Sequence, residues 1–87
     1  MTSYRIEITP AAGRQIKKLS PDVQRQIVSR LEALAIDPRP TGVVKLSGEE
    51  NLYRIRLSDY RIVYEIQDDA LLILITKAGH RREIYRR

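Results

Sequence analysis

Hydrophobic and polar residues alternate most regularly in the middle of the chain, across Leu52 to Ile66 (LYRIRLSDYRIVYEI). Alternation with a period of two is typical of a β-strand with one buried face. The central Ser58-Asp59 pair is short and polar, which favours a two-residue hairpin turn. The stretch therefore predicts two antiparallel strands, paired so that Arg56 lies opposite Arg61.

The predicted pairing divides the hairpin into an apolar face and a cationic face. The apolar face holds Tyr53, Ile55, Leu57, Tyr60, Ile62 and Tyr64. The opposite face, called the arginine face below, holds Arg54, Arg56, Arg61 and Val63. Like charges directly opposite each other across a strand pair are destabilising. The arginine face is therefore expected to meet either water or an anionic ligand.

Two helices are predicted upstream of the hairpin, after a short alternating strand over Tyr4 to Ile8. Thr9-Pro10 is an N-cap followed by proline at the first helical position, and it opens a helix to about Leu19. Ser20-Pro21 repeats the signal and opens a second helix to about Ala35, with an apolar stripe at Val23, Ile27, Leu31 and Leu34. The short break between them predicts an antiparallel helix hairpin.

The rest of the chain predicts further extended segments. The loop from Asp37 to Gly42 ends the helices, and Val43 to Leu46 is a short extended entry to the hairpin. Leu71 to Ala78 (LLILITKA) is apolar on both faces at its start, which predicts a central strand covered on both sides. We expect Gly79 to end this strand and the tail, His80 to Arg87, to add a short edge strand.

This order of elements predicts an α+β fold. An N-terminal strand and a two-helix hairpin would pack on one face of a small antiparallel β-sheet, and the arginine face would be left on the other side. The 87 residues show no linker, so we expect a single domain over residues 1–87.

Composition narrows the function classes. The formal net charge of +5 favours an anionic partner such as nucleic acid, a membrane surface or an acidic protein. The absence of cysteine excludes disulfides and Cys-based zinc sites, and a single histidine argues against a metal centre. The N-terminal segment lacks the apolar stretch of a signal peptide, and no apolar run approaches the roughly 20 residues that cross a membrane. We therefore expect a cytoplasmic protein without membrane association.

The candidate chemistry lies on the arginine face and in the tail, which carries His80, Arg81, Arg82, Tyr85, Arg86 and Arg87. The tail leaves a strand beside the hairpin, so we expect it to lie beside or over the arginine face. Arginine has a planar fork that suits phosphate, and a cluster of arginines would stabilise the charge that develops in a phosphodiester transition state. Tyrosine can stack on a base or transfer a proton, and histidine titrates near neutral pH.

Simpler interpretations remain open at this point. Arg54 and Arg56 could belong to a solvated outer strand face, on which Glu65 is a diagonal neighbour of Arg54 and could pair with it. The tail could be a charged terminus that frays.

Four motifs together resemble a known family. They are KLSG at Lys45–Gly48, YRIR at Tyr53–Arg56, DYRIVY at Asp59–Tyr64 and HRREIY at His80–Tyr85. With the order of elements they resemble the RelE/ParE superfamily of bacterial and archaeal toxins over essentially the whole chain. The resemblance implies a RelE-like fold and a toxin of a type II toxin–antitoxin system.

The resemblance also implies an activity and partners. RelE-type members enter the ribosomal A site and cut mRNA there without a metal or cofactor, by attack of a ribose 2′-oxygen on the adjacent phosphate. The implied partners are a cognate antitoxin, the ribosome and mRNA. An antitoxin-bound hetero-oligomer would bind operator DNA through the antitoxin. The alternative within the superfamily is a ParE-like, non-enzymatic inhibitor of DNA gyrase.

Residue roles follow from the resemblance by position. It implies that Arg54 and Arg56 stand where the type enzyme has two lysines that serve as base and charge stabiliser, and that Arg61 binds the phosphate. Arg81 would stabilise charge or protonate the leaving oxygen, and Tyr85 would orient the substrate and stack on a base. His80 falls where some relatives have Lys or His. Further contacts to RNA phosphates are expected from Lys45, Arg82 and Arg86.

Arginine at positions 54 and 56 leaves the general base unassigned. Arginine stays protonated until above about pH 12, so it is a poor proton acceptor. Three options remain open: His80 is the base, Tyr85 is the base with its pKa lowered by the surrounding arginines, or ribosomal RNA and water take the proton. We favour the third, with Tyr85 and His80 assisting.

Overall fold

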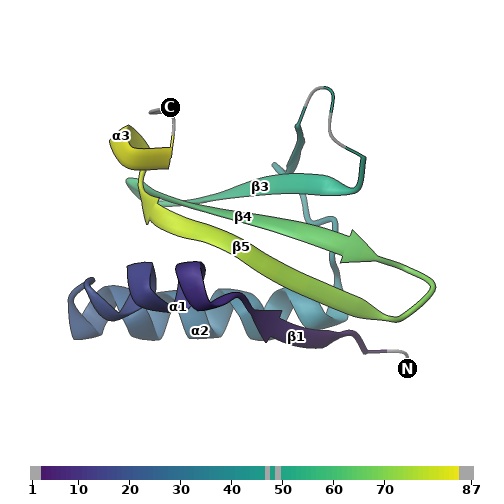
Figure 1. Cartoon of the computed structure of the whole chain (residues 1–87), viewed down its shortest axis with the longest axis horizontal. Coiled ribbons are helices and arrows are strands. Elements are labelled where there is room, and N and C mark those ends of the chain that lie inside the picture. Colours follow the sequence, from purple (N-terminus) through teal and green to yellow (C-terminus); the bar gives the residue numbers. More distant parts are fainter. Residues whose placement is uncertain (1–2, 47, 49, 85–87) are drawn as a thin grey trace.

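The helices and strands follow one another largely as predicted (Figure 1). The computed structural model describes residues 3–46, 48 and 50–84. Its elements are β1 (Arg5–Ile8), α1 (Pro10–Lys17), α2 (Pro21–Ile36), β2 (Val44–Lys45), β3 (Leu52–Leu57), β4 (Tyr60–Gln67), β5 (Leu72–His80) and α3 (Arg81–Ile84). None of the described helices is long and apolar enough to cross a membrane.

Both long helices begin at the predicted caps. The Thr9 side chain accepts a hydrogen bond from the Ala12 N–H at 3.1 Å, and the Ser20 hydroxyl accepts one from the Val23 N–H at 3.3 Å. Each cap satisfies a backbone donor that has no partner within the helix, and the following proline removes another. The chain then reverses between α1 and α2, so the two helices lie antiparallel beneath the sheet (Figure 1).

The five strands form one sheet in the order β1-β5-β4-β3-β2. β3, β4 and β5 form the predicted antiparallel meander, and Arg56 lies opposite Arg61 as expected. β1 joins the sheet as an edge strand parallel to β5, with Ile6 opposite Ile73. Parallel pairing requires a long crossover, and α1, α2, β2, β3 and β4 lie between these two strands in the sequence.

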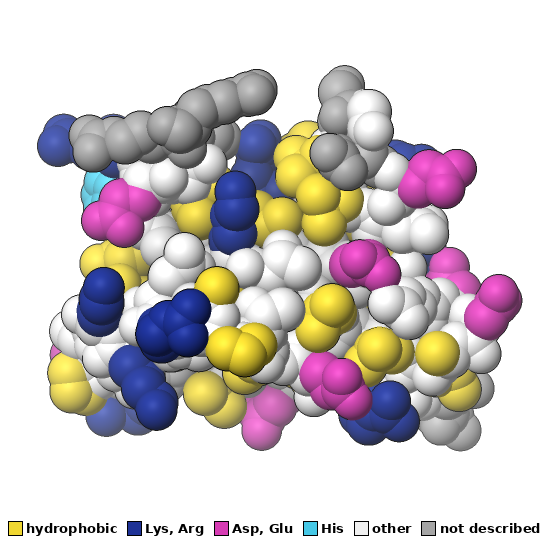
Figure 2. All heavy atoms as spheres, in the orientation of Figure 1, with side chains coloured by type: hydrophobic (Ala, Val, Ile, Leu, Met, Phe, Trp, Pro, Cys, Tyr) yellow, Lys and Arg dark blue, Asp and Glu magenta, His cyan; other side chains and the backbone are white. Residues whose placement is uncertain are grey.

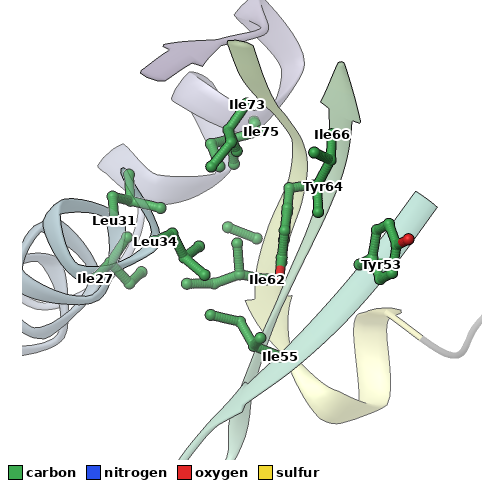
Figure 3. Packing of buried hydrophobic residues seen from close by; sticks show 12 residues of the cluster. Ile27, Leu31, Leu34, Tyr53, Ile55, Ile62, Tyr64, Ile66, Ile73 and Ile75 are labelled. Carbon is green, nitrogen blue, oxygen red and sulfur yellow. The ribbon is translucent and has the colours of Figure 1, made fainter. Parts of the chain in front are cut away.

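The core lies between the helices and the apolar face of the sheet (Figure 3). Ile62 and Tyr64 of β4 are fully buried, and Tyr53 and Ile55 of β3 pack beside them. The helices contribute Ala12, Ile27, Leu31 and Leu34. The prediction that the apolar hairpin face supports both helices is therefore confirmed.

Two predictions for the C-terminal region are wrong. Gly79 does not end β5, because it is a buried member of the ladder and pairs with Arg61. The tail adds no edge strand over Arg81–Ile84, where the chain forms the helical turn α3. The ladder ends where the Arg81 N–H donates to the Asp59 carbonyl at 2.8 Å. Asp59 lies in the hairpin turn, so no further strand is available for pairing.

A β-bulge interrupts the pairing of β4 with β5. Val63 pairs with Lys77 and Tyr64 pairs with Ile75, which leaves Thr76 as an extra residue on β5. The Thr76 hydroxyl donates to the Val63 carbonyl at 3.2 Å. A bulge reverses which face the following residues occupy. Lys77 and Gly79 therefore lie on the arginine face, while Ala78 enters the core.

Candidate functional site

The arginine face is the surface of the sheet opposite α1 and α2. The register of β3, β4 and β5 arranges its side chains in two neighbouring rows. Residues that pair across adjacent strands point to the same side of a sheet. The pairing therefore shows which side chains are neighbours on the arginine face. One row is Arg56, Arg61 and Gly79, and the next is Arg54, Val63 and Lys77.

Helix α3 covers one end of this face (Figure 1). A Cβ atom placed on Gly79 would lie 3.8 Å from Ile84 Cδ1 and 3.7 Å from Glu83 Oε2. Since Gly79 pairs with Arg61, that Cβ would project onto the arginine face. For residues 81–84, the prediction that the tail lies over the arginine face is therefore confirmed.

Arg61 is held by the turn of its own hairpin. Its Nη1 donates to the Ser58 carbonyl at 3.1 Å and to the Tyr60 carbonyl at 2.9 Å. Ser58 adopts a φ of 57°, the left-handed conformation that such a tight turn requires. One guanidinium nitrogen is thereby anchored, and Nε and Nη2 form no hydrogen bond with a described residue.

Three cations of the face, Arg56, Arg61 and Lys77, lie outside the ion pairs that join described residues. The ion pairs between described residues are Arg5–Glu7, Arg25–Asp22 and Arg39–Asp68. None of them includes Arg56, Arg61 or Lys77. Figure 2 shows Lys and Arg side chains (dark blue) in the upper part of the view, on the side of the molecule opposite α1 and α2. An anion bound here would relieve the repulsion between Arg56 and Arg61.

Two of the predicted site residues lie elsewhere. His80 pairs with Tyr60 on the helix-facing side, and the two rings meet edge to face with centroids 5.7 Å apart. The His80 Nδ1 accepts a hydrogen bond from the Arg82 N–H at 3.2 Å. Lys45 pairs with Tyr53, so the register places it on the side opposite the arginine face.

The structure describes only some of the remaining predicted site residues. Arg54 is half-buried on β3, whereas Arg81 and Arg82 are exposed on α3. Tyr85 and Arg86 lie outside the described residues, so their predicted roles are carried by the resemblance alone.

Lys77 is a further member of the arginine face, which the sequence pattern did not predict. It is exposed and lies in the row of Arg54, across Val63. Strict alternation from the buried Ile75 would have assigned Lys77 to the core. A lysine at an apparent core position was the one signal in the sequence that a bulge precedes it.

A second polar cluster, away from the arginine face, ties together distant parts of the chain. Asp68 accepts hydrogen bonds from both terminal nitrogens of Arg39, at 3.0 and 3.4 Å, and from the Tyr4 hydroxyl at 2.7 Å. The bonds from Arg39, and then the one from Tyr4, lower the pKa of the Asp68 carboxyl. Arg39 also lies over the ring of Tyr53, 5.2 Å from its centroid. The cluster joins the N-terminus, the loop after α2, β3 and the β4–β5 turn.

The described residues contain no group of three or more His, Cys, Asp or Glu side chains arranged to hold a metal ion. The chemistry that the arginine face itself offers is binding of an anion by several cations. Such an arrangement suits a phosphate with two charged oxygens.

Comparison with known proteins gives the family. Residues 6–85 match the family model of the ParE toxin of type II toxin–antitoxin systems, parDE. The mRNA interferase toxin RelE of Escherichia coli K12 is 29% identical over 87 residues, covering 95% of this chain and 90% of its own. The toxin RelG of Mycobacterium tuberculosis is 28% identical, and the match covers 97% of this chain and 98% of RelG.

Solved structures show the same fold. The archaeal RelE–RelB complex from Pyrococcus horikoshii matches with a TM-score of 0.81 and 31% identity, covering 93% of this chain and 97% of that one. The intact E. coli RelBE toxin–antitoxin complex matches with a TM-score of 0.80 and 26% identity, covering 90% and 96%.

Proposed function

The chain belongs to the family of ParE toxins of type II toxin–antitoxin systems, and we propose that it acts as a RelE-like endoribonuclease that cuts mRNA in the ribosomal A site. It is a RelE-like toxin by its relatives and by its fold. The observation that carries the proposal is the gathering of Arg54, Arg56, Arg61 and Lys77 on one sheet face.

The arginine face would bind the scissile phosphate. Arg61, anchored to the hairpin turn, has Nε and Nη2 left to contact a phosphate oxygen. Arg56, directly opposite, would hold a second oxygen, and Arg54 and Lys77 would add charge from the next row. Cations that are already in place stabilise the extra negative charge of a pentavalent phosphate more than that of the ground state.

The nucleophile would be the substrate's own ribose 2′-oxygen, so the reaction needs no metal-bound water. Its attack on phosphorus breaks the bond to the 5′-oxygen and leaves a 2′,3′-cyclic phosphate and a 5′-hydroxyl. Arg81 on α3 would stabilise the charge on the departing oxygen. Tyr85 would stack on a base, and Arg82 and Arg86 would contact neighbouring phosphates.

An antitoxin is the expected protein partner of a type II toxin. The matching structures of the Pyrococcus and E. coli relatives are toxin–antitoxin complexes. We propose that an acidic or amphipathic antitoxin segment binds this chain and blocks the arginine face or displaces α3. The net charge of +5 favours an acidic segment.

The decisive experiment uses ribosomes programmed with a synthetic mRNA and the purified toxin. Primer extension should reveal a cut within the A-site codon. A matched mRNA with a 2′-deoxynucleotide at the cut position should remain whole, because the nucleophile is absent. Cleavage of the deoxy substrate would contradict the mechanism, and an intact ribonucleotide substrate would contradict the function.

Inhibition of DNA gyrase is the second candidate, because the family model that matches is that of ParE. A gyrase inhibitor has no need for a cationic cluster arranged around one phosphate. Inhibition of supercoiling at toxin concentrations that leave ribosome-bound mRNA intact would favour this alternative.

A further inference from the structure

The arginine face carries a carboxylate as well as cations. Glu83 Oε2 lies 3.7 Å from the position that a Cβ on Gly79 would take, and Gly79 lies beside Arg61 in the sheet. Adjacent strands are about 4.8 Å apart. Cβ atoms of paired residues are about 4.5–5.5 Å apart, so the Glu83 carboxylate lies within about 9 Å of the Arg61 Cβ position.

Two features place this carboxylate over the sheet. Glycine at position 79 leaves the space above β5 open, and the half-buried Ile84 packs into the same space, with Cδ1 3.8 Å from that Cβ position. Ile84 therefore anchors α3 to the sheet, and the adjacent Glu83 is carried onto the arginine face. Glu83 itself is exposed and forms no hydrogen bond or ion pair with any residue that the structure describes.

The other carboxylates near the hairpin are less suitable as proton acceptors. Glu65 points to the arginine face but lies beyond Val63, and its Oε2 accepts a hydrogen bond from Gln67 Nε2 at 2.6 Å. Asp59 lies in the turn at the end of the hairpin, outside both rows. His80 points to the other side of the sheet, and its Nδ1 already accepts a hydrogen bond.

We propose that Glu83 is the general base of the cleavage reaction, an inference that rests on the proposed ribonuclease function. The Glu83 carboxylate accepts the proton of the ribose 2′-hydroxyl while the 2′-oxygen forms its bond to phosphorus. The bond from phosphorus to the 5′-oxygen breaks, and the departing oxygen keeps the electron pair and takes a proton from water. The arginines hold the phosphate beside the carboxylate and stabilise the negative charge that develops on the phosphate oxygens.

Glu83→Gln tests this role because glutamine keeps the shape of the side chain and cannot accept the proton. We expect the maximal single-turnover cleavage rate on programmed ribosomes to fall by about 10²–10⁴-fold, with the half-saturating toxin concentration unchanged. Glu83→Asp should recover part of the rate. Glu32→Gln, a matched change on the exposed surface of α2, should cleave as the wild type does.

The pH dependence distinguishes a base from a structural residue. If a carboxylate is the base, the wild-type rate should be flat between about pH 6 and pH 8, because glutamate side chains in general are ionised in this range. The Glu83→Gln variant depends on hydroxide, so its rate should rise about tenfold per pH unit. A wild-type rate that itself rises with pH would instead indicate a base of high pKa, such as tyrosine, and would overturn the proposal.

Three outcomes separate this inference from the function on which it rests. If the wild type does not cut ribosome-bound mRNA, the ribonuclease function fails. If the wild type cuts and Glu83→Gln cuts equally well, the function stands and Glu83 is not the base. Faster cleavage with tighter RNA binding by Glu83→Gln would also overturn the proposal, since the carboxylate would then be an anion that competes with the phosphate.

Discussion

At the scale of single residues, the site depends on where a few charged side chains are fixed. Arg61 is bound to two carbonyls of the hairpin turn, and Arg56 lies directly opposite. A preorganised cation loses less conformational entropy when it binds a phosphate than a mobile one does. The cost is repulsion between the two arginines in the empty site, which a bound phosphate would offset.

Arg61→Ala should lower the cleavage rate by about 10²–10³-fold, because one charge-stabilising contact in the transition state is lost. Thermal unfolding should change little, since the Arg61 side chain lies on the arginine face, outside the core. Single-turnover cleavage on programmed ribosomes measures the rate. Arg14→Ala removes the same charge from the exposed surface of α1 and serves as the control. Cleavage by Arg61→Ala at the rate of that control would refute the assignment.

At the scale of elements, the hairpin β3–β4 serves both the core and the site. Its apolar face supports α1 and α2, and its other face carries the arginines. β5 completes the site only because the bulge at Thr76 moves Lys77 and Gly79 onto the arginine face. Gly79 in turn leaves room for α3, so one irregularity in β5 positions both Lys77 and α3.

Ile62→Ala should lower the free energy of unfolding by about 2–5 kcal/mol, because it leaves a cavity in the middle of the core. Ile62 is fully buried, whereas Ile36 is 64% exposed at the end of α2. Ile36→Ala should therefore cost much less. Urea unfolding followed by circular dichroism measures both variants, and equal losses would show that the core is placed wrongly.

The Arg39–Asp68 pair should make the free energy of unfolding decrease as the pH becomes acidic. Its hydrogen bonds lower the pKa of Asp68 in the folded protein below the unfolded value of about 3.9. The stabilisation is therefore present above that unfolded value and is lost as the pH falls through the lowered, folded pKa. Asp68→Asn should reduce the loss of stability between about pH 6 and pH 3.

Urea midpoints across this pH range test the prediction. Arg39→Gln removes the principal cause of the lowered pKa and should weaken the pH dependence in the same way. A wild type and an Asp68→Asn variant with identical pH dependence would show that this pair makes no contribution.

At the scale of the whole molecule, the two sides of the sheet have separate tasks. One side is covered by α1 and α2 and supplies the core, while the other meets solvent, the loop before β3 and α3 (Figure 1). Because of this separation, side chains on the arginine face can be substituted without altering the core. It also concentrates part of a net charge of +5 on the face that would bind RNA.

RNA binding should therefore depend on salt. For three or four phosphate contacts, the logarithm of the affinity should fall with the logarithm of salt concentration with a slope of about −2 to −3. Fluorescence anisotropy with the uncleavable deoxy-substituted mRNA on ribosomes measures this slope. Lys77→Ala should make it shallower by about 0.7, whereas Lys17→Ala on α1 should leave it unchanged. Equal slopes for all three proteins would exclude Lys77 from the phosphate site.

The helix starts and the hairpin could both be predicted from the residue pattern. Thr9 and Ser20 cap helices through contacts three residues away, and the two strands of the hairpin are joined by a two-residue turn. These are short-range interactions, so a local pattern is enough to predict them. The two faces of the hairpin, including the row of Arg56 and Arg61, followed from the same pattern.

How β5 and α3 complete the site, and where β1 joins the sheet, depends on contacts between distant parts of the chain. The bulge at Thr76 arises from the pairing of β4 with β5, and it reverses the alternation along β5, so that Lys77 lies on the arginine face and His80 on the other side. The parallel contact of β1 with β5 joins segments more than sixty residues apart. The strand ladder ends at Asp59, and residues 81–84 then form α3 over Gly79. Each outcome depends on which distant backbone groups are available for hydrogen bonding, and a local pattern of residues does not contain that information.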